Sequence, residues 1–168
     1  MVDKYISINA SGDKQEVAAT DASTGVSEAG KIVALDTNGK ISDTMMPTGV
    51  SAEVKVLPTS ENLGALDMVN VFDNSGTATA RKADKSNGRA CSGYVVSAVT
   101  SPANANVYTD GIISGLSGMT PGATQYLDDA GGLTETPTTT TDEILQRVGV
   151  ALSATELLFE PGEPVTRA

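Results

Sequence analysis

Catalytic side chains are scarce in this chain of 168 residues, which contains no histidine and a single cysteine, Cys91. Without histidine there is no Ser-His-Asp or Cys-His activation of a nucleophile and no histidine ligand for a metal. One cysteine forms neither an internal disulfide nor a thiolate zinc site. Cys91 is therefore expected to be a small buried hydrophobe. Carboxylates remain as the chemically active groups to consider.

Two sets of carboxylates are close in sequence: Asp128 and Asp129 with Glu135, and Asp36 with Asp43. Paired acids can bind calcium or carry out glycoside hydrolysis. Neither set has the spacing of an EF-hand, because Gly39 comes too early after Asp36. Aspartate and asparagine next to glycine are also common in tight turns. Structural turns are therefore the favoured interpretation, with adventitious metal binding as the alternative.

Two further patterns could indicate ligand binding. Residues 25–32, Gly-Val-Ser-Glu-Ala-Gly-Lys-Ile, nearly match the phosphate-binding loop, but Ile32 replaces the hydroxyl that would bind magnesium. The flanking residues predict a turn before a strand, not a strand followed by a helix. Tyr94, Tyr108 and Tyr126 could form a sugar-binding face, although such tyrosines more often lie in a core or an interface. The sequence thus predicts no catalytic, cofactor-binding or metal-binding residue, and we expect no enzyme.

Composition limits the partners of the chain. Apolar residues make up 39% and aromatic residues 4%, so we expect a thin core that subunit contacts supplement. The net charge is −10 and no basic stripe is present, which argues against nucleic acid as a partner. No apolar run is long enough for a membrane span or a signal sequence. We expect synthesis in the cytoplasm without export.

Short strands separated by turn residues are predicted throughout residues 51–168, which favours a small antiparallel β-barrel or sandwich. The most apolar stretch, residues 148–160, predicts a β-hairpin, or two strands broken by a bulge, ended by Pro161. Residues 61–68 could form a helical turn, and 134–141 an exposed loop. The predicted strands are residues 52–57, 68–72, 77–82, 93–99, 106–113, 124–127, 145–152 and 157–160.

Residues 1–50 have a different pattern. A strand is predicted at 5–8 and another at 31–36, with a loop or weak helix over 15–30 between them. An Asn-Gly turn at 37–40 leads into an irregular segment that contains Pro47. So little apolar surface does not support independent folding, so we expect an extended arm that becomes ordered on a partner or on its own symmetry mates.

Short apolar segments follow one another in a particular order through residues 64–160. They are residues 66–71, 93–96 and 107–113, then the turn 119–127, the Gly-Gly-Leu-Thr segment 131–134 and the closing strand 145–153. This order resembles that of bacteriophage capsid cement (head decoration) proteins of the small β-barrel, or β-tulip, kind. Separately, residues 30–50 look like a connector found in phage head- and tail-fibre proteins.

The resemblance implies a mainly β protein, with an N-terminal arm over 1–50 for attachment or trimer connection and a β-barrel decoration domain over 51–168. It implies a homotrimeric virion protein on the outer surface of an icosahedral head, with the major capsid protein as partner and neither nucleic acid nor membrane. A fibre adhesin that binds a host receptor or glycan is the alternative, and a virion glycosidase using Asp128, Asp129 or Glu135 is a remote one. Attachment is expected from residues 1–14 and 31–50. The candidate contact residues are Tyr5, Ile6, Ile8, Ile32, Val33, Leu35, Ile41, Met45, Met46 and Pro47.

Overall fold

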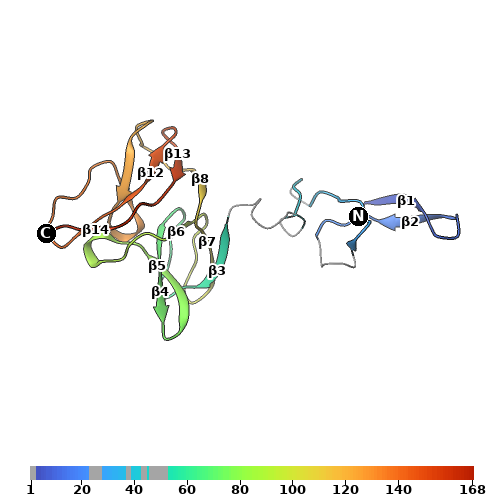
Figure 1. Ribbon diagram of the computed structural model, residues 1–168, viewed down its shortest axis with the longest axis horizontal. Helices are drawn as coiled ribbons and strands as arrows, with labels where there is room; N and C mark the ends of the chain where they lie inside the picture. Colours follow the sequence, from blue (N-terminus) through green and yellow to red (C-terminus); the bar gives the residue numbers. More distant parts are fainter. Residues whose placement is uncertain (1–2, 23–27, 37–38, 43–44, 46–52) are drawn as a thin grey trace. The chain divides into compact units, whose positions relative to one another are not determined.

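The computed structural model describes residues 3–22, 28–36, 39–42, 45 and 53–168 (Figure 1). Its contacts divide the chain into two compact units, Met1–Ser51 and Ala52–Ala168. Every ladder between the described strands is antiparallel. The predicted mainly β class is therefore confirmed.

In the described part of the first unit, β1 (Lys4–Ile8) and β2 (Lys14–Ala18) form a hairpin. Asn9 shapes the connection, because its side-chain oxygen accepts the backbone N–H groups of Ser11 and Asp13, each at 2.9 Å. The predicted loop or weak helix over 15–30 is thus wrong at its start. The polar residues of β2 form a strand because they pair with the backbone of β1.

The strand predicted at 31–36 is reduced to a single parallel bridge between Thr20 and Val33. Two backbone hydrogen bonds make this bridge, from Thr20 to Ile32 and from Ala34 to Thr20. Because β2 ends at Ala18, no regular edge continues beside this segment. Beyond the bridge, the N–H of Gly39 donates to the carbonyl of Asp36 at 3.0 Å, and the N–H of Asp36 donates to the carbonyl of Lys40 at 2.7 Å.

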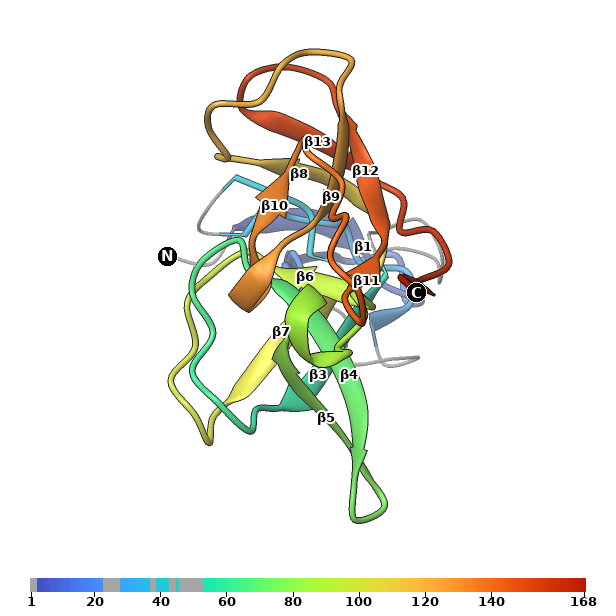
Figure 2. The same cartoon turned by 90° about the vertical axis from the view of Figure 1, so that its left-hand side faces the viewer.

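The second unit contains two five-stranded sheets, which Figure 2 shows as an upper and a lower group. The first sheet has the order β10 (Leu133–Thr134), β9 (Thr124–Leu127), β12 (Arg147–Ala151), β13 (Glu156–Phe159) and β8 (Gly111–Ser114). The second has the order β3 (Val54–Pro58), β7 (Asn104–Tyr108), β6 (Gly93–Val95), β4 (Met68–Asn74) and β5 (Thr77–Lys82).

Smaller elements complete this unit. A two-stranded ribbon pairs β11 (Ile144–Leu145) with β14 (Val165–Thr166). Two 3₁₀ turns, η3 (Lys85–Asn87) and η4 (Asp129–Gly131), are the helical elements described here. The helical turn predicted over 61–68 is wrong: Leu63 instead forms an antiparallel bridge with Val99, and Leu66 has a left-handed backbone.

Several predicted strands have different limits in the structure. The predicted hairpin over 148–160 is confirmed, with Val150 opposite Leu158. The single strand expected over 106–113 is two strands, β7 and β8, which belong to different sheets. The chain changes sheet at Gly111, whose φ of 108° is a conformation that glycine tolerates best. The strand predicted over 93–99 ends early, at Val95.

Both sheets are open among the described strands, so their strands do not form the closed ring of a barrel. The second sheet nevertheless curls, because Thr59, next to β3, bridges to Ala80 in β5 at the opposite edge. The N–H of Ser60 also donates to the carbonyl of Ala80 at 3.1 Å. One point of contact thus links the two edges of this sheet.

Two clusters of buried apolar side chains stabilise the second unit. The first joins the sheets: Met68 and Tyr94 of one pack with Ile113, Leu157 and Phe159 of the other. The second contains Val69, Val95 and Val107 among others. Because neighbouring residues in a strand point to opposite faces, the pairs Met68–Val69 and Tyr94–Val95 place the clusters on opposite faces of the second sheet. The remaining members of the second cluster are Leu57, Leu63, Ala80 and Ala105.

The β12–β13 hairpin requires glycine at one position, which leads to a test of stability. A Cβ on Gly149 would lie 2.0 Å from the carbonyl oxygen of Leu158, a backbone atom of the paired strand. We expect Gly149→Ala to lower the free energy of unfolding by about 3 kcal/mol, as overpacking of a core does. Denaturant unfolding followed by circular dichroism measures the loss.

Gly162→Ala is the matched control for this substitution. A Cβ there would meet Arg147 at 3.8 Å, an ordinary contact, so a change within about 0.5 kcal/mol is expected. Equal stability of the two variants would show that the close approach at Gly149 does not constrain the hairpin.

Candidate functional site

The predicted contact residues of the first unit lie largely on its surface. Met46 and Pro47 fall outside the described residues. Tyr5 and Met45 are half-buried. The others are 47–69% exposed, a high value for large apolar side chains: Ile6, Ile8, Ile32, Val33, Leu35 and Ile41.

The β1–β2 hairpin explains why two of these side chains are so exposed. Alternation along β1 places Ile6 and Ile8 on one face, where the register sets Glu16 and Lys14 opposite them. On the same face Lys4 forms an ion pair with Glu16, with Nζ and Oε1 3.0 Å apart. The exposed fractions of Ile6 and Ile8 are 66% and 69%. This face of the hairpin therefore carries two exposed isoleucines flanked by charged side chains.

No described residue of the first unit is buried. An isolated two-stranded hairpin is marginally stable in water at best, because it has no second layer to cover either face. Exposed apolar side chains gathered on a small surface often mark a site of interaction. The described part of Met1–Ser51 therefore has the character of a contact surface, with Ile6 and Ile8 at its most regular part.

The acidic residues that suggested chemistry are not brought together. Asp128 pairs with Lys85, with Oδ1 and Nζ 2.6 Å apart, and Asp129 lies 4.0 Å from the same Nζ. Glu135 instead accepts hydrogen bonds from the backbone N–H of Thr120 and from the side chain of Gln125. In the second set, Asp43 lies outside the described residues. Within the described ranges, no three acidic or cysteine side chains form a group that could hold a metal ion.

The partner of Asp128 sets its protonation. The hydrogen bond from Lys85 holds the pKa of the Asp128 carboxyl below its ordinary value, and the same bond raises the pKa of Lys85. Both groups are therefore charged at neutral pH. The ion pair joins η3 to the turn after β9, which favours the structural interpretation of this acidic pair.

Two of the three tyrosines belong to the core. Tyr94 is buried and stacks on Tyr108 with ring centroids 5.4 Å apart, and Phe159 meets it edge-on at 5.1 Å. Its hydroxyl donates to the carbonyl of Asp110 at 3.2 Å. Tyr126 lies separately in β9, opposite Arg147. The three rings therefore do not form one sugar-binding face.

Cys91 is buried, as predicted, and burial raises the pKa of its thiol to about 12. Such a thiol is unreactive at neutral pH. Its backbone is held by the buried side chain of Gln146, which accepts from the N–H of Cys91 at 2.6 Å and donates to its carbonyl at 3.0 Å. The same amide donates to the carbonyl of Gly162 at 2.9 Å. Gln146 thus connects the loop before β6 to the C-terminal segment.

The segment that resembles a phosphate-binding loop lies partly outside the described residues, which begin again at Glu28. Lys31 forms an ion pair with Glu28, with Nζ and Oε2 2.7 Å apart. A carboxylate therefore already balances the charge of this lysine. A bridge at Val33 follows it in place of a helix. This geometry differs from that of a phosphate-binding loop.

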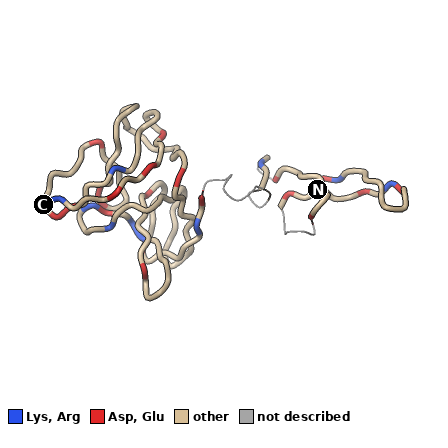
Figure 3. The backbone as a smooth tube through the Cα atoms, viewed as in Figure 1, with Lys and Arg blue, Asp and Glu red and all other residues tan. Residues whose placement is uncertain are grey.

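Basic residues are frequent along residues 81–89, on β5 and the turn after it, and Figure 3 marks their positions along the backbone. Lys82 pairs with Asp67 and Arg89 with Glu61, each at 3.1 Å. Arg81 lies over the ring of Phe72, with 4.0 Å between the guanidinium carbon and the ring centroid. A neighbouring carboxylate therefore balances the charge of Lys82 and that of Arg89.

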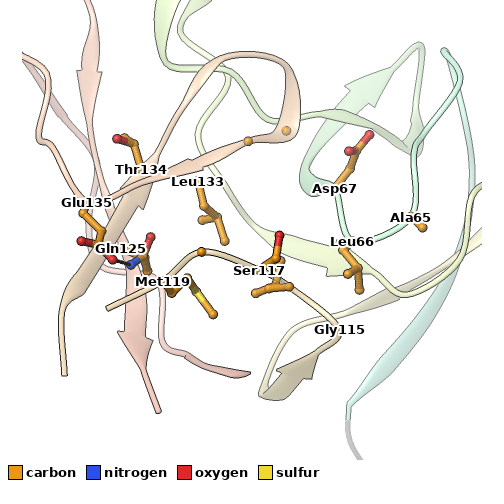
Figure 4. A pocket seen from close by; sticks show the side chains of 14 residues that line it. Ala65, Leu66, Asp67, Gly115, Ser117, Met119, Gln125, Leu133, Thr134 and Glu135 are labelled. Carbon is orange, nitrogen blue, oxygen red and sulfur yellow. Dashed lines mark hydrogen bonds between the residues drawn. The ribbon is translucent and has the colours of Figure 1, made fainter. Parts of the chain in front are cut away.

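Sequence reasoning missed a cavity of about 440 Å³ in the second unit (Figure 4). Four segments line it: residues 65–67, 115–119 and 131–135, with Gln125 from β9. Its wall includes Gly131, which has a φ of 83° and lies so close to Asp67 that a Cβ would be 3.0 Å from that side chain. The glycines at 115, 118, 131 and 132 indicate turns in two of these segments, but not that the turns enclose a cavity together. The sequence groups Glu135 with Asp128 and Asp129, whereas in the structure its hydrogen-bond partners are Thr120 and Gln125.

Within the part of the chain that is described, the structure contains no helix with the length and apolar character needed to cross a membrane. Comparison with protein-family models gave no match, and neither did a search of curated proteins.

The Lys85–Asp128 ion pair predicts an effect of pH. Because the pKa of Asp128 is depressed in the folded protein, its stabilising contribution is present above the unfolded pKa and is lost as the pH falls through the folded pKa. We expect Lys85→Met to raise the pKa of Asp128 and to destabilise the protein by no more than about 1 kcal/mol at neutral pH. NMR titration of the Asp128 carboxyl carbon measures the first effect.

Lys55→Met, at an exposed position of β3, is the control and should leave this pKa unchanged. If the Asp128 carboxyl titrates identically in Lys85→Met and the unmodified protein, the ion pair does not set its charge.

Proposed function

We propose that this chain is a bacteriophage virion protein, a homotrimeric decoration (cement) protein. It binds the outer surface of the icosahedral head through its N-terminal unit and stabilises the shell. The observation that carries the proposal is the contrast between the two units. All the buried apolar residues described lie in Ala52–Ala168, whereas the described part of Met1–Ser51 buries none and exposes several large apolar side chains.

The N-terminal hairpin supports an attachment role in two ways. Ile6 and Ile8 offer apolar surface whose burial on a partner would be favourable. The outer edges of β1 and β2 also carry backbone groups that can pair with a strand of another chain. The proposed partner is the major capsid protein. The resemblance of residues 64–160 to cement proteins supports this choice.

The mechanism of stabilisation is mass action. A protein that binds the assembled lattice and not its separate subunits shifts the equilibrium toward the lattice. Three arms on one trimer make attachment multivalent, so contacts that are weak singly become durable together. The thin core of each subunit is compatible with support from neighbouring copies. This function requires no catalytic residue.

The alternative, a fibre adhesin, has less support from the arrangement of side chains. Glycan recognition commonly uses exposed aromatic rings, but Tyr94 and Tyr108 are stacked in the core.

Substitutions on the hairpin test the attachment role. We expect Ile6→Asn combined with Ile8→Asn to weaken binding to heads that lack this protein by at least about a hundredfold, because each buried isoleucine contributes roughly 1.5–3 kcal/mol. Co-sedimentation with the heads measures the binding, and light scattering after gel filtration measures whether the variant remains trimeric.

Leu152→Asn is the matched control. This leucine is also exposed, at 47%, but it belongs to the second unit. It should bind heads as the unmodified protein does. Full binding by the hairpin variant would rule out this surface as the site of attachment, and a monomeric unmodified protein would contradict the trimer.

A further inference from the structure

The cavity of about 440 Å³ differs in chemistry along its length (Figure 4). Gln125 and Glu135 lie together at one end, joined by a hydrogen bond of 3.2 Å. Leu133, Met119 and Leu66 line the space beside them. A ligand that fits must therefore combine a polar end with an apolar stem.

Gln125 is a buried polar side chain whose hydrogen-bonding capacity is incompletely used. It is 2% exposed, and its amide nitrogen Nε2 donates to Oε1 of Glu135. Because a carboxylate only accepts, this bond fixes which end of the amide carries the oxygen. The structure gives that oxygen no partner, yet none of the fully enclosed polar side-chain atoms described lacks one. The oxygen of Gln125 is therefore not fully enclosed, and Gln125 is one of the residues that line the cavity.

Glu135 adds a negative charge to this end. Its Oε1 accepts the backbone N–H of Thr120 at 2.5 Å, and this hydrogen bond lowers the pKa of the carboxyl. The group is therefore ionised at neutral pH. The side chain of Thr120 also hydrogen-bonds this carboxylate and lowers its pKa further, but no lysine or arginine among the described residues forms an ion pair with Glu135. Asp67 also lines the cavity, but Lys82 and the N–H of Gly64 already bind it.

We propose that this cavity binds a primary alkylammonium group. The ammonium lies against Glu135 and the oxygen of Gln125, and its methylene stem lies along Leu66, Met119 and Leu133. An ammonium supplies three N–H donors and the positive charge that the carboxylate of Glu135 lacks, and one of these donors can reach the oxygen of Gln125. An aliphatic stem buries apolar surface while its charged head meets polar groups. No aromatic ring lines the cavity, which disfavours a quaternary ammonium or a sugar.

Titration of the full-length, ¹⁵N-labelled protein tests this assignment. The probes are Nα-acetyl-lysine methylamide, which presents a lysine side chain, and cadaverine, a free diamine of similar stem. Nα-acetyl-norleucine methylamide has the same stem without the charge. We expect saturable shifts of the Thr120 amide and the Gln125 side-chain amide with the charged probes, with Kd in the millimolar range. The norleucine compound should bind at least about tenfold more weakly.

Glu135→Gln is the informative variant, because it removes the charge but keeps an acceptor for the N–H of Thr120. It should weaken binding of the charged probes about tenfold. Glu163→Gln, an equal change of charge at an exposed position outside the cavity, should bind them normally.

Three outcomes would overturn the proposal: equal shifts with lysine and norleucine compounds, undiminished binding by Glu135→Gln, or no saturable shift with either amine. If the site is upheld, tighter binding of the lysine compound assigns it to a side chain of another polypeptide, and tighter binding of cadaverine assigns it to a free amine. The result does not depend on whether the protein binds heads.

Discussion

The fold depends on the burial of apolar side chains between the two sheets of the second unit. Met68 and Leu157 are fully buried there, and Tyr94 and Phe159 add aromatic contact between the sheets. Hydrophobic burial is the main favourable contribution to folding. The β12–β13 hairpin supplies much of one side of this core, and it can do so because Gly149 allows the close approach of Leu158.

The two units differ in how much apolar surface they bury. The second unit has enough apolar surface for two clusters, whereas none of the described isoleucines and valines of the first unit is buried. Backbone pairing and one exposed ion pair hold the hairpin, and such contacts contribute little to stability. Apolar surface that a chain does not bury within itself is available to a partner. The proposed attachment role follows from this division.

The sequence predicted those strands and turns whose formation depends mainly on neighbouring residues. The β12–β13 hairpin was predictable because its apolar runs are bounded by small polar residues and a proline. By contrast, β2 was missed because Lys14, Gln15 and Glu16 carry no apolar alternation and form a strand only through pairing with β1. Strands β7 and β8 were merged because valine and isoleucine continue on both sides of the turn at Asp110, although the Asp-Gly step before Ile112 was a usable turn signal.

The cavity was beyond prediction for a different reason. Glu135 was grouped with Asp128 because the two are close in sequence, but its hydrogen bonds come from Thr120 and Gln125. Nothing in the sequence indicates that Gln125 is a buried residue with an unused acceptor. Such a site forms where loops that are distant in sequence pack together, here those at 115–119 and 131–135. The sequence of either loop alone does not indicate this packing.

The central claim is that this protein covers a capsid lattice, and its abundance in purified particles tests that claim most directly. Quantitative mass spectrometry of the particles gives the number of copies relative to the major capsid protein. Near-equal numbers are the predicted result, because a decoration protein occupies equivalent positions over the whole head. A few copies per particle would contradict the account and would assign the protein to a tail or a unique vertex.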